Sequence, residues 1–173
     1  MTSADRSLKP ITREGVAAAL QKAHRYRVLN DPTAAESICL DVLAVDPGNA
    51  EALVVHLLAI TDQFGSGAGA ADLARAEDAA SRLEDPYRKA YYRGIVCERW
   101  AKSILLRAAP HAHETAHDWL TQALGHYELA ESLRPAGNDE SILRWNTCVR
   151  LLQRDSRIRP SEPDSQEPVL ELE

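Results

Sequence analysis

The residues best suited to chemistry in this chain of 173 residues lie in the run His113-Glu114-Thr115-Ala116-His117. On a helix, His113 and His117 would lie one turn apart and could bind a zinc ion, with Glu114 as the general base of a hydrolase. Against that interpretation, no third ligand follows at the usual spacing, and Asp118 stands where zinc proteases keep an uncharged residue. Glu114 also points away from the apolar stripe of the same stretch. A metal-dependent hydrolase or an incidental metal site therefore stays an alternative, and we expect no catalytic residue and no resident metal.

Other enzymatic chemistry has no recognisable pattern in the sequence. There is no glycine-rich phosphate loop, no nucleotide-binding fingerprint, and no pairing of a serine or cysteine nucleophile with histidine. Cys39, Cys97 and Cys148 are widely spaced within apolar helical stretches, which is typical of small buried side chains in a reducing compartment. We expect a protein that is not an enzyme and needs no cofactor.

The charge of the chain is uneven. The formal net charge is −6, and residues 155–173 carry six acidic residues against two arginines, so the remainder is close to neutral. That balance lacks the positive field of a nucleic-acid-binding protein. No apolar run is long enough to span a membrane and the N-terminus has no secretory pattern, so a cytoplasmic location is expected by default.

Seven helical stretches are separated by breaks that contain proline, glycine or an Asn-Asp pair. Asp31 is a suitable N-cap, and Pro32 at the first helical position loses nothing by lacking an N–H. The expected domains are a flexible N-terminus over 1–10, a helical domain over 11–154 and a disordered acidic tail over 155–173, which contains three prolines. The expected helices span about 11–29, 32–46, 50–63, 70–83, 86–108, 112–133 and 139–154.

Small and aromatic residues recur in these helices with a regular spacing. Ala123, Tyr127, Ala130 and Pro135 follow one another as A-x3-aromatic-x2-A-x4-P, and Ala90-Tyr91-Tyr92-Arg93-Gly94 places rings beside small residues. The window from Val16 to Asn49 has a matching set at Ala23, Tyr26, Ala35, Cys39, Val42 and Pro47. These residues resemble the tetratricopeptide repeat (TPR), over about 15–153 and with two units distorted. The alternative is a generic alanine-rich bundle.

The resemblance implies an all-α, right-handed solenoid of helical hairpins that binds a partner peptide or helix in a concave groove, as an adaptor or scaffold does. The basic clamp that some members use for a C-terminal carboxylate is absent, because Leu20, His24 and Val55 stand at its positions. The groove residues that the resemblance implies are His24, Arg27, Leu58, Arg88, Tyr91, Arg99, Thr147 and Arg150, with Leu20, Val54, Thr61, Ile95 and Leu143 among them.

The last helix and the tail leave alternatives open. Arg144 and Trp145 are residue types that anchor interfaces, but Trp145 could instead pack on the sixth helix and seal the end of the domain. The exposed ends of a solenoid could also stack on copies of the chain, which would make it a self-associating structural domain. The acidic tail either only solvates the protein, or it folds back or onto a partner through its end at 169–172.

Overall fold

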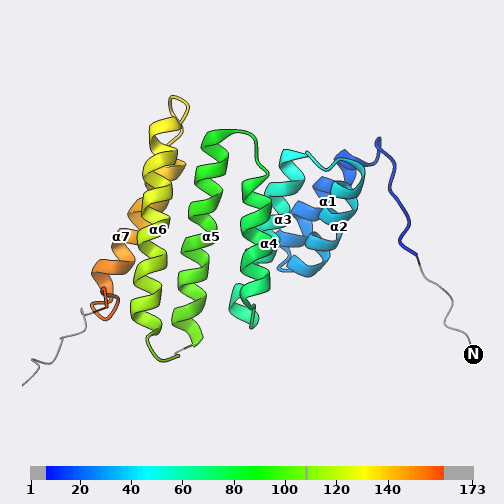
Figure 1. The fold of residues 1–173 in the computed structure, drawn as a ribbon. Coiled ribbons are helices and arrows are strands. Elements are labelled where there is room, and N and C mark those ends of the chain that lie inside the picture. The colour runs from blue at the N-terminus through cyan, green and yellow to red at the C-terminus, as the bar shows by residue number, and fades with distance from the viewer. Residues whose placement is uncertain (1–6, 108, 162–173) are drawn as a thin grey trace, which may run out of the picture.

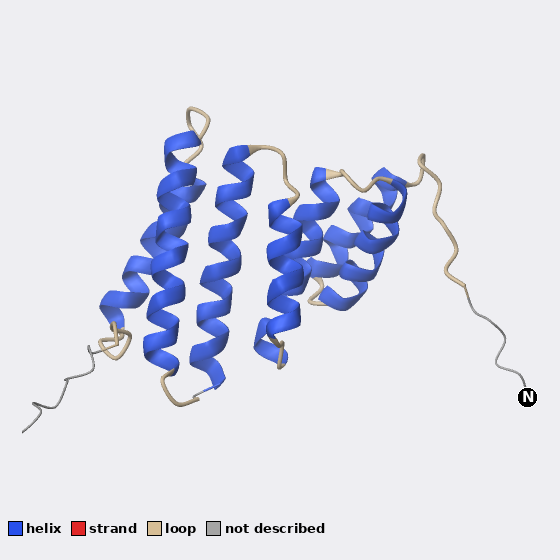
Figure 2. Ribbon diagram, in the orientation of Figure 1, coloured by secondary structure: helices blue, strands red, loops and turns tan. Residues whose placement is uncertain are grey.

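Seven α-helices follow one another in a row, with residue 7 and residue 161 towards opposite ends of it (Figure 1). The computed structural model describes residues 7–107 and 109–161. No strand occurs in that part of the chain, as Figure 2 shows, so the predicted all-α class is confirmed. The helices are α1 (Val16–Val28), α2 (Pro32–Val45), α3 (Ala50–Asp62), α4 (Ala70–Ser81), α5 (Pro86–Arg107), α6 (Ala112–Leu133) and α7 (Glu140–Arg154), and a 3-10 turn, η1 (Phe64–Ser66), follows α3.

Three helices begin at a side chain that accepts a backbone hydrogen bond. The N–H of Ala34 donates to Asp31 at 3.0 Å, that of Ala52 to Asn49 at 2.9 Å, and that of Arg88 to Asp85 at 2.7 Å. Each such cap satisfies an N–H that has no partner within its helix and contributes about 1 kcal/mol. The predicted cap at Asp31 is confirmed.

The first helix differs from its predicted range. It begins at Val16 rather than Ile11, because the N–H of Gly15 donates to both the hydroxyl and the carbonyl of Thr12 and closes a turn there. Ile11 nevertheless packs against the main core. The predicted tail is described only as far as residue 161, and within that part Ile158 is buried against the cluster formed by α5, α6 and α7. Residues 1–6 of the predicted N-terminal segment and 162–173 of the tail lie outside the described residues.

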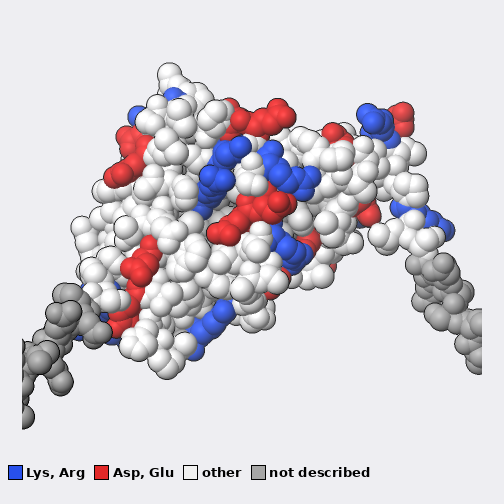
Figure 3. Space-filling view, viewed as in Figure 1, with Lys and Arg blue, Asp and Glu red and all other residues white. Residues whose placement is uncertain are grey.

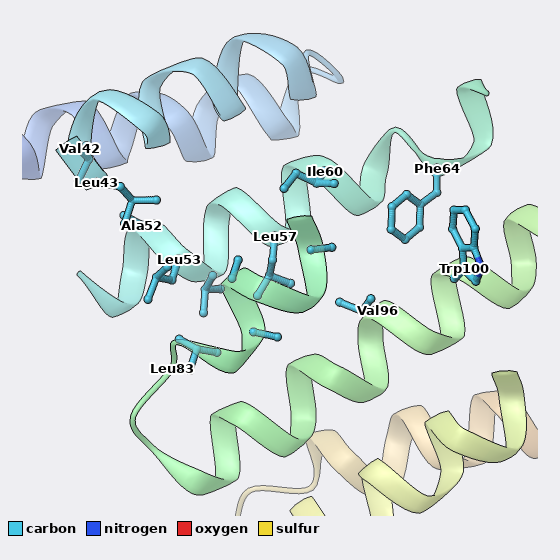
Figure 4. Close-up of a cluster of buried hydrophobic side chains, with 14 residues drawn as sticks. Val42, Leu43, Ala52, Leu53, Leu57, Ile60, Phe64, Leu83, Val96 and Trp100 are labelled. Carbon is cyan, nitrogen blue, oxygen red and sulfur yellow. The ribbon is translucent and has the colours of Figure 1, made fainter. Parts of the chain in front are cut away.

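Consecutive helices contact one another along the row, and α3 also contacts α1 and α5. The main core lies where α2, α3, η1, α4 and α5 meet (Figure 4). At one end of it, the ring edge of Phe64 meets Trp100 with the centroids 5.1 Å apart. Arg107 also lies over the Trp100 ring, 5.0 Å from its centroid, and donates to the carbonyls of Phe64 and Ala68. The glycine-rich segment 64–69, which follows α3, is thus held against α5 by Phe64 and by these two hydrogen bonds.

The α5–α6 hairpin has the most extensive contact in the molecule, and small residues make it possible. Gly94 on α5 lies directly against the ring of Tyr127 on α6, and a Cβ at Gly94 would lie only 2.5 Å from the ring. Along the same crossing Ala90, Ala123 and Ala130 are buried. Because small side chains let two helix backbones approach closely, the ring of Tyr127 can fill the space between them completely.

Candidate functional site

The predicted groove residues of the first three odd-numbered helices lie on neighbouring helices. His24 and Arg27 belong to α1, Leu58 to α3, and Arg88, Tyr91 and Arg99 to α5. Because α3 contacts both α1 and α5, these three helices form one continuous surface, which we call the odd-helix face.

Two carboxylates of α3 connect the cations of this face. Glu51 accepts from His24 at 2.7 Å and lies 3.6 Å from Arg88. At the other end of α3, Asp62 pairs with Arg27 at 2.8 Å and with Arg99 at 2.5 Å. Each carboxylate therefore bridges one basic side chain from α1 and one arginine from α5. The three arginines predicted on these helices, Arg27, Arg88 and Arg99, are thus already paired with carboxylates of the chain.

Glu51 and Asp62 are members of this face that were not among the predicted groove residues. They stand eleven residues apart, which is about three helical turns, so both project from the same side of α3. Their sign is opposite to that of the predicted basic residues on the helices either side. The spacing of these two acidic residues, together with their charge opposite to that of the neighbouring basic residues, could have indicated that they belong to this face.

Apolar residues lie under the face between the two bridges. Val54 and Ile95 are each 4% exposed, and Thr61 is equally buried, so these three support the face from below. Leu20 and Leu58 are half-buried and pack against the main core. Arg99 also donates to the hydroxyl of Thr61 at 2.7 Å and to the carbonyl of Leu58 at 3.3 Å, which fixes its side chain against α3.

The predicted groove residues of α7 are less closely joined to the others. Thr147 is half-buried and donates to the carbonyl of Leu143 in its own helix, and Leu143 is exposed. Arg150 is exposed and makes no ion pair with a carboxylate of the described residues. The bridges that unite α1, α3 and α5 do not extend to α7.

Arg144 and Trp145, the predicted interface anchors, both pack within the molecule. Arg144 Nη2 lies 2.9 Å from Oε2 of Glu98, a side chain with no exposed surface. The hydroxyl of Tyr127 donates to the same oxygen at 2.7 Å, and Lys102 reaches the other oxygen at 2.5 Å. The half-buried ring of Trp145 belongs to the adjoining apolar cluster.

This buried group, Glu98 with Lys102, Tyr127 and Arg144, ties α5, α6 and α7 together. Burial and the negative charge of Glu98 raise the pKa of Tyr127 well above its usual value, so its hydroxyl stays protonated and keeps donating. Breaking one member of such a group leaves a buried charge without its partner, which is costly. The side chain of Arg144 therefore stabilises the packing of α7 against α5.

The histidines of the predicted zinc pattern lie near the start of α6. His113 and His117 are half-buried, and Nδ1 of His117 lies 3.6 Å from Asp118. His111 precedes the helix in a left-handed conformation and lies 4.0 Å from Glu114. Among residues 7–107 and 109–161, no three His, Cys, Asp or Glu side chains are arranged to share a metal ion.

The surface is hollowed between α4, α5 and α6. This hollow of about 460 Å³ has Val96 and Cys97 among its lining, together with Glu77, Arg93 and His126. Burial raises the pKa of the Cys97 thiol to about 12, so the thiol remains protonated and unreactive at neutral pH. Figure 3 shows basic and acidic side chains interleaved near the middle of the face in view, with no continuous area of one sign.

Comparisons with protein-family models, with curated proteins and with solved structures find no significant match to this chain. None of the helices in the described part is long and apolar enough to cross a bilayer.

Proposed function

We propose that this chain is a non-enzymatic protein-interaction module, a short TPR-type solenoid whose odd-helix face binds a peptide or helix of a partner protein. The observation that carries the proposal is the joining of α1, α3 and α5 into one surface. Helices two places apart in the chain touch there and share the carboxylates of Glu51 and Asp62. A surface spanning several helices offers a partner segment an extended contact, which is how helical repeat arrays bind.

The packing of the repeat-like residues supports the TPR part of the proposal. Ala23, Ala35, Cys39 and Val42 have no exposed surface, and neither do the corresponding residues of α6, Ala123, Tyr127 and Ala130. Gly94 has a steric reason to be glycine, because the ring of Tyr127 occupies the space of a side chain. Of the same sets, Tyr26 is half-buried and Pro47 and Pro135 are exposed, so it is the positions at the helix crossings that support the repeat.

The charges of the face bear on the kind of partner. Arg27 and Arg99 are both paired with Asp62, and Arg88 is near Glu51, so the face is not a basic channel. An acidic partner segment would have to compete with Asp62 and Glu51 for these arginines. Each such ion pair is weak, but the arginines are not free charges that another carboxylate could bind without breaking it. A partner segment held chiefly by apolar contacts and by hydrogen bonds fits this face better.

Site-specific photo-crosslinking in cells tests which face is used. A photoreactive amino acid is placed at His24 or Arg88 on the odd-helix face, and at Leu40 or Thr121, which are exposed on α2 and α6, as matched controls. We expect one and the same partner protein to be cross-linked from both odd-helix positions and from neither control. Equal cross-linking from α2 and α6 would show that the odd-helix face is not the binding surface.

Self-association is the competing class of function. It predicts cross-links between copies of the chain and a mass that rises with concentration in light scattering. Under our proposal, the purified protein keeps the mass of one chain, 19.1 kDa, across concentrations. A dimer whose cross-links arise from Leu143 at the exposed side of α7 would replace the partner-binding proposal.

A further inference from the structure

A hollow of about 340 Å³ opens where the first turns of α5 meet the loop between α6 and α7. Three tyrosines line it. The rings of Tyr87 and Tyr91 are stacked, 5.9 Å apart and 17° from parallel, and the ring of Tyr92 stands edge-on to Tyr91 at 5.1 Å. Pro135 and Asn138 complete the side contributed by the loop. We call this the tyrosine hollow.

Two carboxylates, those of Asp85 and Glu140, also line the tyrosine hollow. Neither is within ion-pair distance of a cation in the described part of the chain. Asp85 accepts the backbone N–H of Arg88, and Glu140 receives one long hydrogen bond, 3.4 Å, from the hydroxyl of Tyr87. The carboxylates of the hollow thus keep most of their capacity to accept hydrogen bonds.

Two cations lie near the hollow, and each has a carboxylate partner outside it. Arg88 is itself a lining residue: its side chain lies 3.6 Å from Glu51 on α3 and also hydrogen-bonds Tyr92. Arg144 is paired with the buried Glu98. The tyrosines stay neutral: burial and the charge of Glu140 raise the pKa of Tyr91 to about 12, and those of Tyr87 and Tyr92 are raised as well. The hollow therefore combines neutral aromatic rings with two carboxylates and one arginine, so its lining carries a net negative charge.

We propose that the tyrosine hollow binds an arginine or lysine side chain of the partner segment. A cation is attracted to the face of a tyrosine ring and, at the same time, to carboxylates that form no ion pair within the described residues. Arg88 and Tyr91 belong to both the hollow and the predicted groove, so the inference rests on the proposed function and adds the chemistry of one partner residue. An acidic or phosphorylated residue would be repelled by Asp85 and Glu140 at the same place.

A titration with small molecules tests the hollow without the partner. The full chain is titrated with N-acetyl-arginine methylamide while the ring signals of its five tyrosines are followed by NMR. We expect saturable shifts at Tyr87, Tyr91 and Tyr92, with Tyr26 on α1 as the unaffected reference. N-acetyl-citrulline methylamide has nearly the same shape without the charge, and it should cause no saturable shift.

Matched variants locate the charge that is responsible. Glu140→Gln should weaken the affinity for the arginine probe about threefold, as expected for a partly exposed ion pair. Glu128→Gln, which removes an exposed carboxylate from α6, should leave the affinity unchanged. Equal binding of citrulline, an unchanged affinity in Glu140→Gln, or shifts that never saturate would each overturn the inference.

The titration and the cross-linking can fail independently. If cross-linking identifies a partner on the odd-helix face but the arginine probe does not bind, the assignment of the tyrosine hollow is wrong and the proposed function stands. If the probe binds but the partner is cross-linked from α2 and α6, the hollow is a cation site outside the binding surface, and the inference that it reads a partner residue is wrong.

Discussion

Replacing Gly94 with alanine should destabilise the protein, although alanine is the better helix former. The new Cβ would lie 2.5, 2.7 and 2.9 Å from three ring atoms of Tyr127. Carbon atoms in contact prefer separations of about 3.5–4.0 Å, so the ring or the helix must move by about 1 Å. Tyr127 has no exposed surface, and its hydroxyl donates to Glu98 at 2.7 Å, so the ring cannot move without straining that bond.

The magnitude follows from two opposing effects. Overpacking of a close-packed core costs about 1–3 kcal/mol, and the gain from removing a glycine within a helix is about 0.5–1 kcal/mol. We expect a net loss of about 1–2 kcal/mol in the free energy of unfolding, which lowers the melting temperature by about 3–6 °C for a domain of this size. Urea unfolding followed by circular dichroism measures the loss.

Gly125→Ala is the matched control for this experiment. Gly125 is exposed within α6, and a Cβ there would meet nothing within 4 Å. This variant should be more stable than the natural chain by about 0.5–1 kcal/mol. If both alanine variants were stabilised alike, the close packing of α5 against α6 at Tyr127 would be refuted.

Three further predictions concern the buried polar groups and thiols. Glu98→Gln should lower the free energy of unfolding by about 1–3 kcal/mol, because Tyr127 and Arg144 lose a charged hydrogen-bond acceptor, and the exposed Glu128→Gln should not; urea unfolding compares them. Burial lowers the pKa of His56 in the folded chain. Below about pH 6.5 the unfolded chain therefore binds a proton at His56 that the folded chain does not bind. Stability should therefore fall as the pH decreases from 7.5 to 5.5, and an equally steep slope in His56→Phe would contradict this origin. All three cysteines are buried with pKa values raised to about 12, so a thiol reagent at pH 8 should label the folded protein slowly and label three thiols in urea. Cys97 lines the hollow between α4, α5 and α6, and Cys97→Ala should remove the fastest phase.

The sequence predicted the helices well because each break has a local chemical cause. Asp31, Asn49 and Asp85 accept hydrogen bonds from the first turns that follow them, and such caps depend on residues only three positions apart. The exception, the start of α1, has the same kind of cause. The hydroxyl of Thr12 closes a turn that the apolar periodicity does not reveal.

The candidate site was predictable only in part, because its contacts join distant segments. Arg27 and Arg99 were expected on the surface of a groove, but their shared partner, Asp62, is 35 and 37 residues away in sequence. Arg144 is of a residue type that anchors interfaces, but it pairs within the chain with Glu98, which lies on another helix. The tyrosine hollow depends on the loop between α6 and α7 folding over the start of α5, which no local pattern indicates.

The two bridges on α3 bear on how the array comes apart. In a linear array of helices, stability is approximately a sum of the intrinsic stability of each unit and of its interfaces with the next, so the ends can fray independently. Glu51 and Asp62 add couplings between helices two places apart. If α1 detaches, Glu51 loses His24 and Asp62 loses Arg27, and each carboxylate keeps only its arginine on α5. Unfolding of the first five helices is thereby made more cooperative than nearest-neighbour contacts alone would make it.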